Sequence, residues 1–265
     1  MKKFTLITIA IVIIALLLWL GMNLFKIKPA AENNNQQNED TPQETSPIAK
    51  EKTVDETTNE YKIDVKYPEI RGISNQQSQN DANQLIKKIT DDGIAGFKND
   101  VEEDAIKDFS LKSTLKMTYE VSYLNDSIAS IKFNIYYYVA GMAHSTDYSS
   151  GFNYNLKDNK PIALGDFFNA NSSFLSALST ICANDLKTQL KSTQYYNEET
   201  IKTGTGEKEE NFAELVFDKN GLTIIFNTYQ VAPYGAGIKL VKIPYSKFSK
   251  INNNSELLKL INGVK

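Results

Sequence analysis

The sequence has very few of the side chains that build cross-links and metal sites. Its 265 residues include one Cys and one His. A single Cys excludes an intrachain disulfide and any multi-cysteine zinc or iron–sulfur site, and a single His excludes the two-histidine metal motifs. We therefore expect neither a disulfide framework nor a metal or other cofactor, and the scarcity of reactive side chains favours binding over catalysis.

Excess positive charge is also absent. The formal net charge is −3 and the sequence pI is about 5.4, which argues against a nucleic-acid partner, because such proteins are normally basic. The charge is unevenly distributed, with +4 on residues 1–28, −6 on residues 29–60 and −1 on residues 61–265. The low pI therefore belongs to the second segment and says nothing about a ligand of the third.

One long apolar run is present, from Phe4 to Phe25. A transmembrane helix needs about 20 mostly apolar residues, whereas a cleavable signal peptide has an apolar region of about 7–15 residues and a small-residue cleavage site. We interpret residues 1–28 as an uncleaved signal anchor, and cleavage remains the alternative. This predicts a single-pass protein of the cell membrane whose C-terminal part lies outside the cytoplasm.

The segment that follows the apolar run is polar. Residues 29–60 contain no aromatic side chain and are rich in Asn, Gln, Glu, Thr and Pro. Such a composition cannot bury enough apolar surface to offset its ordering entropy, so we predict a disordered acidic linker. Beyond it we predict two α+β subdomains, residues 61–157 and 158–265.

The rest of the chain mixes strand and helix patterns without regular βαβ alternation, which predicts an α+β fold of antiparallel sheets packed with two amphipathic helices. The helices are expected at residues 80–109 and 174–190, and Cys182 lies on the apolar stripe of the second, as a core residue. Residues 192–211 are expected to form a loop. Strands are predicted at 61–67, 113–124, 127–139, 146–156, 212–217, 222–226 and 235–243, with a bulge near Ser130 and a short helix at 255–261.

The single His lies between two aromatic strands, in the stretch Gly141-Met-Ala-His144-Ser145. Tyr138 precedes this stretch and Tyr148 follows it. A lone His among tyrosines can be a general base, part of a sugar-stacking site, or a turn residue that bonds to backbone. Ser145 is too close to His144 in sequence to build the known catalytic triads, whose members come from separate segments.

A second aromatic stretch, residues 227–237, follows an apolar strand. Its Pro233 and two glycines predict a defined corner. Tyr229 and Tyr234 can present flat faces to a glycan or to a protein partner. The alternative is a buried corner in which each hydroxyl bonds to backbone.

These stretches resemble a known family. The chain is similar to the RsiV/PdaC-type extracellular module over residues 136–144, 152–160, 164–168, 217–226 and 229–237. Members of this family include the ectodomain of a lysozyme-sensing anti-sigma factor and the N-terminal region of a peptidoglycan deacetylase. Family members tend to show G-G-A-H-G at 141–145, where this chain has Met142 and Ser145. The resemblance implies an extracytoplasmic module of the bacterial cell envelope.

Two functions follow as hypotheses. The first is a membrane-anchored, non-catalytic module that binds peptidoglycan or a wall-active protein such as lysozyme. The second is a cell-wall hydrolase or esterase that uses His144 as its catalytic base. The candidate ligand-binding residues are Tyr138, Gly141, His144, Tyr148, Tyr229, Pro233 and Tyr234.

Overall fold

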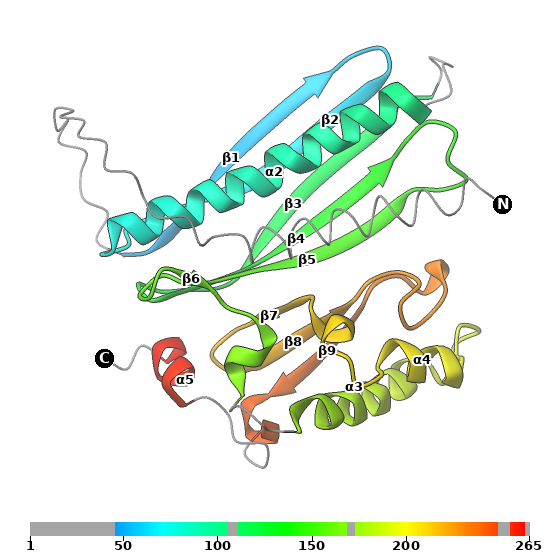
Figure 1. The fold of residues 1–265 in the computed structure, drawn as a ribbon. Helices are drawn as coiled ribbons and strands as arrows, with labels where there is room; N and C mark the ends of the chain where they lie inside the picture. The colour runs from blue at the N-terminus through cyan, green and yellow to red at the C-terminus, as the bar shows by residue number, and fades with distance from the viewer. Residues whose placement is uncertain (1–45, 105–110, 169–172, 249–254, 263–265) are drawn as a thin grey trace, which may run out of the picture.

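The computed structural model describes residues 46–104, 111–168, 173–248 and 255–262. It contains two sheets, each with its own buried core, which lie one above the other in Figure 1. The fold is α+β, as predicted. The predicted anchor at residues 4–25 lies outside the described residues. Of the helices in the described part of the chain, none combines the length and the apolar character that a membrane crossing requires.

The first body is a six-stranded sheet, in the order β1 to β6, with one long helix, α2 (Gln76–Asp104). The strands are β1 (Ile48–Thr57), β2 (Tyr61–Arg71), β3 (Ser113–Leu124), β4 (Ile128–Tyr138), β5 (Thr146–Asn155) and β6 (Lys160–Pro161). The antiparallel prediction is wrong for one pair, because β2 and β3 run parallel. The helix connects these two strands, and a crossover of this kind is what a parallel pair needs.

Strand β1 corrects the predicted linker. From Ile48 onward the segment is ordered, and all ten residues of β1 pair with β2. Val54 packs against the first core. Backbone hydrogen bonds to a neighbouring strand supply the order that composition does not reveal, since they depend on no side-chain type. Residues 29–45 lie outside the described residues.

Helix α2 covers one face of this sheet (Figure 1). Its buried residues Ala82, Ile86, Phe97 and Val101 share a core with alternate residues of the strands, among them Ile63, Val65, Leu115, Met117, Ile131 and Phe133. The prediction ended the second strand before Pro68, but β2 continues to Arg71. Past Val65 this strand pairs only with β1, and strands with a single partner tolerate proline.

The predicted bulge is present, on the neighbouring strand. Val121 pairs with Ile131 and Tyr123 pairs with Ser130, so Ser122 of β3 is the extra residue. The change of phase at Ser130 therefore reflects a register shift between β3 and β4.

The second body is a three-stranded antiparallel sheet, in the order β7-β8-β9, with one longer and several short helices around it. Its α-helices are α3 (Phe174–Leu190), α4 (Glu198–Gly204) and α5 (Ser255–Ile261), and its strands are β7 (Leu215–Phe217), β8 (Gly221–Phe226) and β9 (Lys239–Pro244). Single turns of 3-10 helix occur at η1 (Leu164–Phe167), η2 (Glu209–Phe212), η3 (Tyr234–Ala236) and η4 (Tyr245–Phe248).

Two predictions for this body are corrected. The expected loop 192–211 contains α4, because the Asn197 side chain accepts a hydrogen bond from the Thr200 N–H at 2.9 Å and caps a helix. The expected strand 235–243 begins only at Lys239, since the preceding residues form the turn η3. The described residues therefore hold four α-helices, where two amphipathic helices and a short terminal one were expected.

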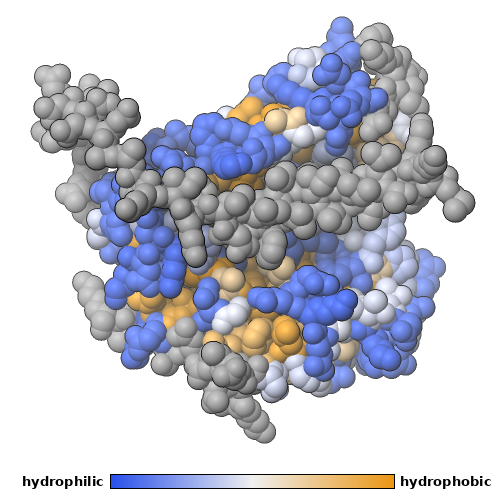
Figure 2. Space-filling view, in the orientation of Figure 1, coloured by the Kyte–Doolittle hydropathy of each residue, from blue (hydrophilic) through white to orange (hydrophobic). Residues whose placement is uncertain are grey.

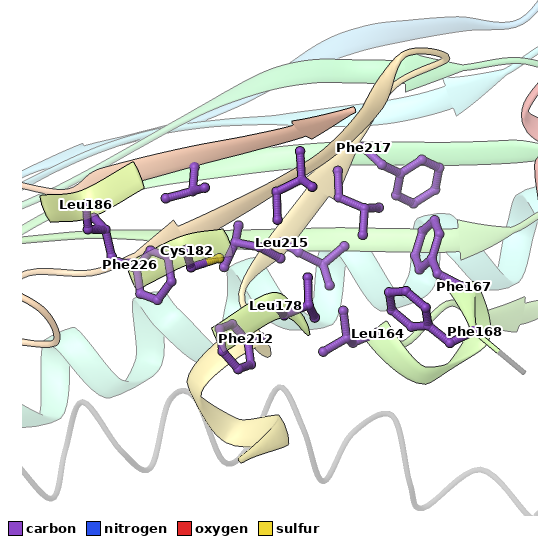
Figure 3. Close-up of a cluster of buried hydrophobic side chains, with 14 of the residues drawn as sticks. Leu164, Phe167, Phe168, Leu178, Cys182, Leu186, Phe212, Leu215, Phe217 and Phe226 are labelled. Atoms are coloured by element: carbon purple, nitrogen blue, oxygen red, sulfur yellow. The ribbon is translucent and has the colours of Figure 1, made fainter. Parts of the chain in front are cut away.

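The sulfur of Cys182 lies inside the core of the second body. Figure 3 shows it among Leu178, Leu186 and Phe226. Burial raises the pKa of this thiol to about 12, with a smaller contribution from Asp185, so the group is a neutral packing residue at physiological pH. The predicted core role is confirmed. On the outside, Figure 2 shows mainly hydrophilic residues over α2 and a mixed surface over the second body.

Candidate ligand-binding site

The β4–β5 turn presents His144 at the end of the first sheet. The Ala140 N–H donates to the buried Ser113 hydroxyl at 2.9 Å, and the Met142 N–H donates to the Val139 carbonyl at 3.0 Å. Gly141 has a φ of +101°, a conformation that side chains with a Cβ rarely adopt. The turn therefore requires this glycine, and it is anchored to β3.

The corner at residues 227–237 begins with a tight turn in which the Gln230 N–H donates to the Asn227 carbonyl at 3.1 Å. Tyr229 is the third residue of this turn and has a φ of +69°. Glycine or asparagine is usual at such a position, because a Cβ there meets the backbone. Backbone strain of this kind collects at functional sites, so Tyr229 is a candidate on geometric grounds.

The inner side of the corner is held by packing. Val231 and Ala232 are buried, and the single turn η3 follows, with Pro233 before it. Gly235 lies against the Tyr195 ring, since an added Cβ would come within 2.8 Å of its hydroxyl oxygen. Tyr195, which precedes α4, therefore packs against the corner at Gly235.

Side chains tie the corner to the open edge of β5. Because β6 pairs only with Tyr154 and Asn155, the outward backbone groups of the earlier residues need other partners. The Asn227 side chain accepts from the Ser149 N–H at 2.8 Å and donates to the Ser149 carbonyl at 2.9 Å. The Thr228 hydroxyl donates to the Asp147 carbonyl at 3.3 Å. These contacts replace a neighbouring strand and place Tyr229 beside the β4–β5 turn.

Glu214 completes the same edge. Its carboxylate accepts from the Gly151 N–H at 3.0 Å and from the Tyr148 hydroxyl. Burial raises the pKa of Glu214, and the hydrogen bonds from Tyr148, Gly151 and Ser150 only partly oppose this effect. Burial also raises the pKa of Tyr148, with the Glu214 charge adding to it. The Tyr148 hydroxyl is therefore hydrogen-bonded within the fold, to Glu214.

Three aromatic side chains meet between the turn and the corner. His144 stacks on Tyr234, with ring centroids 4.2 Å apart and planes 25° apart, and its Nε2 lies 3.0 Å from the Tyr229 hydroxyl. The Tyr229 and Tyr234 centroids are 5.9 Å apart. We call these three residues the His144 cluster. It joins segments that are 85 residues apart in the chain.

The hydrogen bonds of His144 define its tautomer. Its Nδ1 lies 2.7 Å from the Ser145 carbonyl oxygen, which can only accept. In the neutral ring Nδ1 therefore carries the proton, and Nε2 accepts from the Tyr229 hydroxyl. Ser145 Oγ lies 3.0 Å from the Tyr234 hydroxyl, so its partner is Tyr234. Nucleophilic catalysis requires a hydroxyl bonded to its base, and Ser145 and His144 do not form that pair.

The His144 cluster is open to solvent and has a polar rim. Tyr229 is 60% exposed, and His144 is also exposed. The Tyr234 hydroxyl donates to Asp147 Oδ2 at 3.5 Å, beside its contact with Ser145. An exposed aromatic surface with hydroxyl and carboxylate groups at its edge can stack on the flat apolar face of a sugar ring and hydrogen-bond the substituents around it.

The structure therefore brings together three of the predicted residues, His144, Tyr229 and Tyr234, with Gly141 and Pro233 shaping the backbone beside them. Tyr148 is bonded to Glu214, and Tyr138 lies on β4 opposite Thr114. The sequence prediction weighed Ser145 only as a catalytic partner of His144, and it missed Asp147, Thr228 and Tyr195 as site residues. Strand alternation could have revealed Asp147, which lies on β5, but no local signal connects Tyr195 to the corner. Among the described residues, no group of three or more His, Cys, Asp or Glu could hold a metal ion.

Family comparisons divide the chain in two. Residues 54–147 match the family model described as deacetylase PdaC, and residues 165–246 match DUF3298, described as a protein of unknown function. The His144 cluster takes His144 from the first region and its two tyrosines from the second. These matches confirm the resemblance to a PdaC-type module that the sequence shows.

One curated relative is the peptidoglycan-N-acetylmuramic acid deacetylase PdaC of Bacillus subtilis (strain 168), which is 24% identical over 166 residues and covers 63% of this chain. The chain spans only 35% of the length of that relative. Two solved DUF3298 structures share the fold. The one from Bacteroides fragilis has a TM-score of 0.61 at 18% identity and covers 83% of this chain and 98% of its own. The one from Pseudomonas aeruginosa has a TM-score of 0.54 at 16% identity and covers 80% and 95%.

Proposed function

We propose, from the matches of this chain to the PdaC and DUF3298 family models, that it is an extracytoplasmic module that binds a ligand of the bacterial cell envelope without catalysing a reaction on it. The proposed ligand is peptidoglycan or a wall-active protein such as lysozyme. The apolar run at residues 4–25 is proposed to anchor the module in the membrane.

The observation that carries the proposal is the exposure of the His144 cluster. Tyr229 keeps a strained backbone conformation and a largely exposed ring, so this side chain contributes little to the core. Aromatic side chains on a rigid support are typical of residues that dominate binding. The support here is the edge of β5, to which the corner is hydrogen-bonded.

The alternative function, a hydrolase or esterase with His144 as its base, has less support. Both ring nitrogens of His144 have partners within the protein, and neither partner is the Ser145 hydroxyl. The deacetylase activity in the name of the Bacillus subtilis relative belongs to a protein of which this chain spans about a third, so it is not carried over.

The proposal is tested by binding of the purified full chain to insoluble peptidoglycan and to immobilised lysozyme. We expect one of the two to retain the protein, and Tyr229→Ala to weaken the retention about tenfold, which is about 1.4 kcal/mol. Val121→Ala is the matched control, because Val121 is 42% exposed on β3, outside the His144 cluster. Retention by neither material would contradict the proposal.

The same preparation tests the hydrolase alternative. The wild-type chain is incubated with a panel of wall glycans and esters, and released products are measured. Under the binding proposal no product forms. Turnover that disappears in a folded His144→Ala variant would establish the enzyme and refute the non-catalytic module.

A further inference from the structure

We propose that the binding site continues from the His144 cluster across the open face of the first sheet, and that it takes a linear acidic glycan. The extension is the cross-strand row formed by Asp147, Tyr136 and Lys116. This inference rests on the proposed function and deepens it, because it names the ligand class and the residues along which the ligand lies.

The strand register sets out the row. Tyr136 of β4 pairs with Asp147 of β5 on one side and with Lys116 of β3 on the other. Directly paired residues place their side chains on the same face of a sheet. Leu115 and Met117, the neighbours of Lys116, are buried in the core beneath α2, so the row lies on the opposite face.

The row is continuous with the His144 cluster. Asp147 Oδ2 lies 3.5 Å from the Tyr234 hydroxyl, and Ser145, two residues earlier, contacts the same hydroxyl. Tyr234, Asp147, Tyr136 and Lys116 therefore follow one another across the edge and the face of the sheet.

The second body leaves this part of the face open. Farther along β4 and β5 it covers the face, since the Phe217 N–H donates to Ser130 Oγ and the Asn153 side chain donates to the Leu215 carbonyl. At the row itself Tyr136 is 39% exposed, and Lys116 and Asp147 are exposed. A ligand that reaches the His144 cluster can therefore continue onto the row.

The chemistry of the row fits a glycan. Neighbouring strands lie about 4.7–4.9 Å apart, which is close to the length of one pyranose unit along a 1,4-linked chain. Tyr234 and Tyr136 offer aromatic faces, and Asp147 between them can accept hydrogen bonds from sugar hydroxyl or amide N–H groups. Tyrosines that alternate with hydrogen-bonding groups suit successive sugars of one chain.

The positive charge of Lys116, at the far end of the row, favours a sugar that carries a carboxylate. Lys116 is exposed, and none of the ion pairs within the described residues includes it, although Asp64 is next to it in register. Its ammonium group can pair with a carboxylate on a sugar. A large protein partner is less suited to this surface, because only Tyr136 and Tyr229 of the large exposed hydrophobic residues of the described chain lie on it. The others are Ile48, Leu111, Val121 and Tyr196.

The test uses the full chain and soluble, carboxylate-bearing wall glycans of two and four sugars. The variants are Tyr136→Thr, which keeps a strand-forming residue, Tyr136→Phe, which keeps the ring, Lys116→Gln and Tyr229→Ala. Lys219→Gln, at an exposed lysine of the β7–β8 turn, is the charge control. Dissociation constants are measured by calorimetry, and lysozyme is titrated in parallel.

We expect Tyr136→Thr and Lys116→Gln to weaken tetrasaccharide binding about tenfold each, and to leave disaccharide binding at the His144 cluster unchanged. Tyr136→Phe and Lys219→Gln should bind as the wild type does. If Tyr229→Ala weakens binding while the two row variants do not, the extension is refuted and the proposed function stands. Binding of lysozyme without binding of either glycan also refutes the extension. Binding of no ligand refutes both proposals.

Discussion

Replacing Tyr229 by glycine should leave the protein more stable than replacing it by alanine, which reverses the usual order of these two residues. The reason is the φ of +69° at this position. A residue with a Cβ pays about 1–2 kcal/mol in the left-handed region, whereas glycine does not. Glycine loses about 0.5–1 kcal/mol through the greater freedom of its unfolded chain. The difference between the central values, about 1.5 and about 0.75 kcal/mol, leaves Tyr229→Gly more stable than Tyr229→Ala by about 0.75 kcal/mol.

Other effects of the substitution cancel in this comparison. Both variants lose the hydrogen bond between the Tyr229 hydroxyl and His144 Nε2, which at an exposed site contributes about 0.5 kcal/mol. Both also lose the aromatic ring, which is 60% exposed and so buries little surface. The pair therefore isolates the backbone strain.

The measurement is urea unfolding of both variants, with the midpoint and slope compared at equal protein concentration. Tyr136→Gly and Tyr136→Ala are the control pair, because Tyr136 is an exposed tyrosine within strand β4. There glycine should be the less stable by about 0.5–1 kcal/mol. If alanine is as stable as glycine at position 229, Tyr229 is not strained, and the argument that strain marks the site is refuted.

Two further predictions concern the contact between the bodies. An alanine Cβ at Gly151 would lie 1.8 Å from the Leu215 carbonyl oxygen, so Gly151→Ala should lower the free energy of unfolding by about 3 kcal/mol. Gly96→Ala, at an open position of a helix, is the control and should raise it by about 1 kcal/mol. Both are measured by thermal or urea unfolding. A neutral result at Gly151 would show that β7 does not approach β5 so closely. Because burial raises the pKa of Glu214 above its ordinary 4.5, the folded state holds this proton more tightly, and the contribution of the group to stability falls as pH rises from 4.5 through the raised value. The stability of the wild type relative to Glu214→Gln should therefore decline over that range, and a rising difference would contradict the buried carboxyl.

Much of the fold follows from local patterns. The strand at Ser113–Leu124 and the helix at Ser255–Ile261 have the predicted bounds, because long alternation and a clear apolar stripe are properties of the segments themselves. The core position of Cys182 was predictable for the same reason. Side-chain periodicity depends only on neighbouring residues.

The predictions that were wrong have a different cause. Strand β1 is polar and charged, and its order comes from pairing with β2 along its whole length. The parallel pairing of β2 with β3 depends on the path of the chain through α2, and the sequence of neither strand shows that path. Hydrogen bonding between backbones is independent of sequence, so composition underestimates a polar strand at the edge of a sheet.

The candidate site shows the same division. Local sequence patterns are enough to mark a lone His in a glycine-containing turn and two tyrosines in a proline-containing corner. That these residues meet follows from the packing of the two bodies. The Asn227 side chain pairs with the free edge of β5 and draws the corner to the turn, so that His144 stacks on Tyr234. Those edge groups needed partners, and which distant side chain would supply them depends on how the two bodies pack.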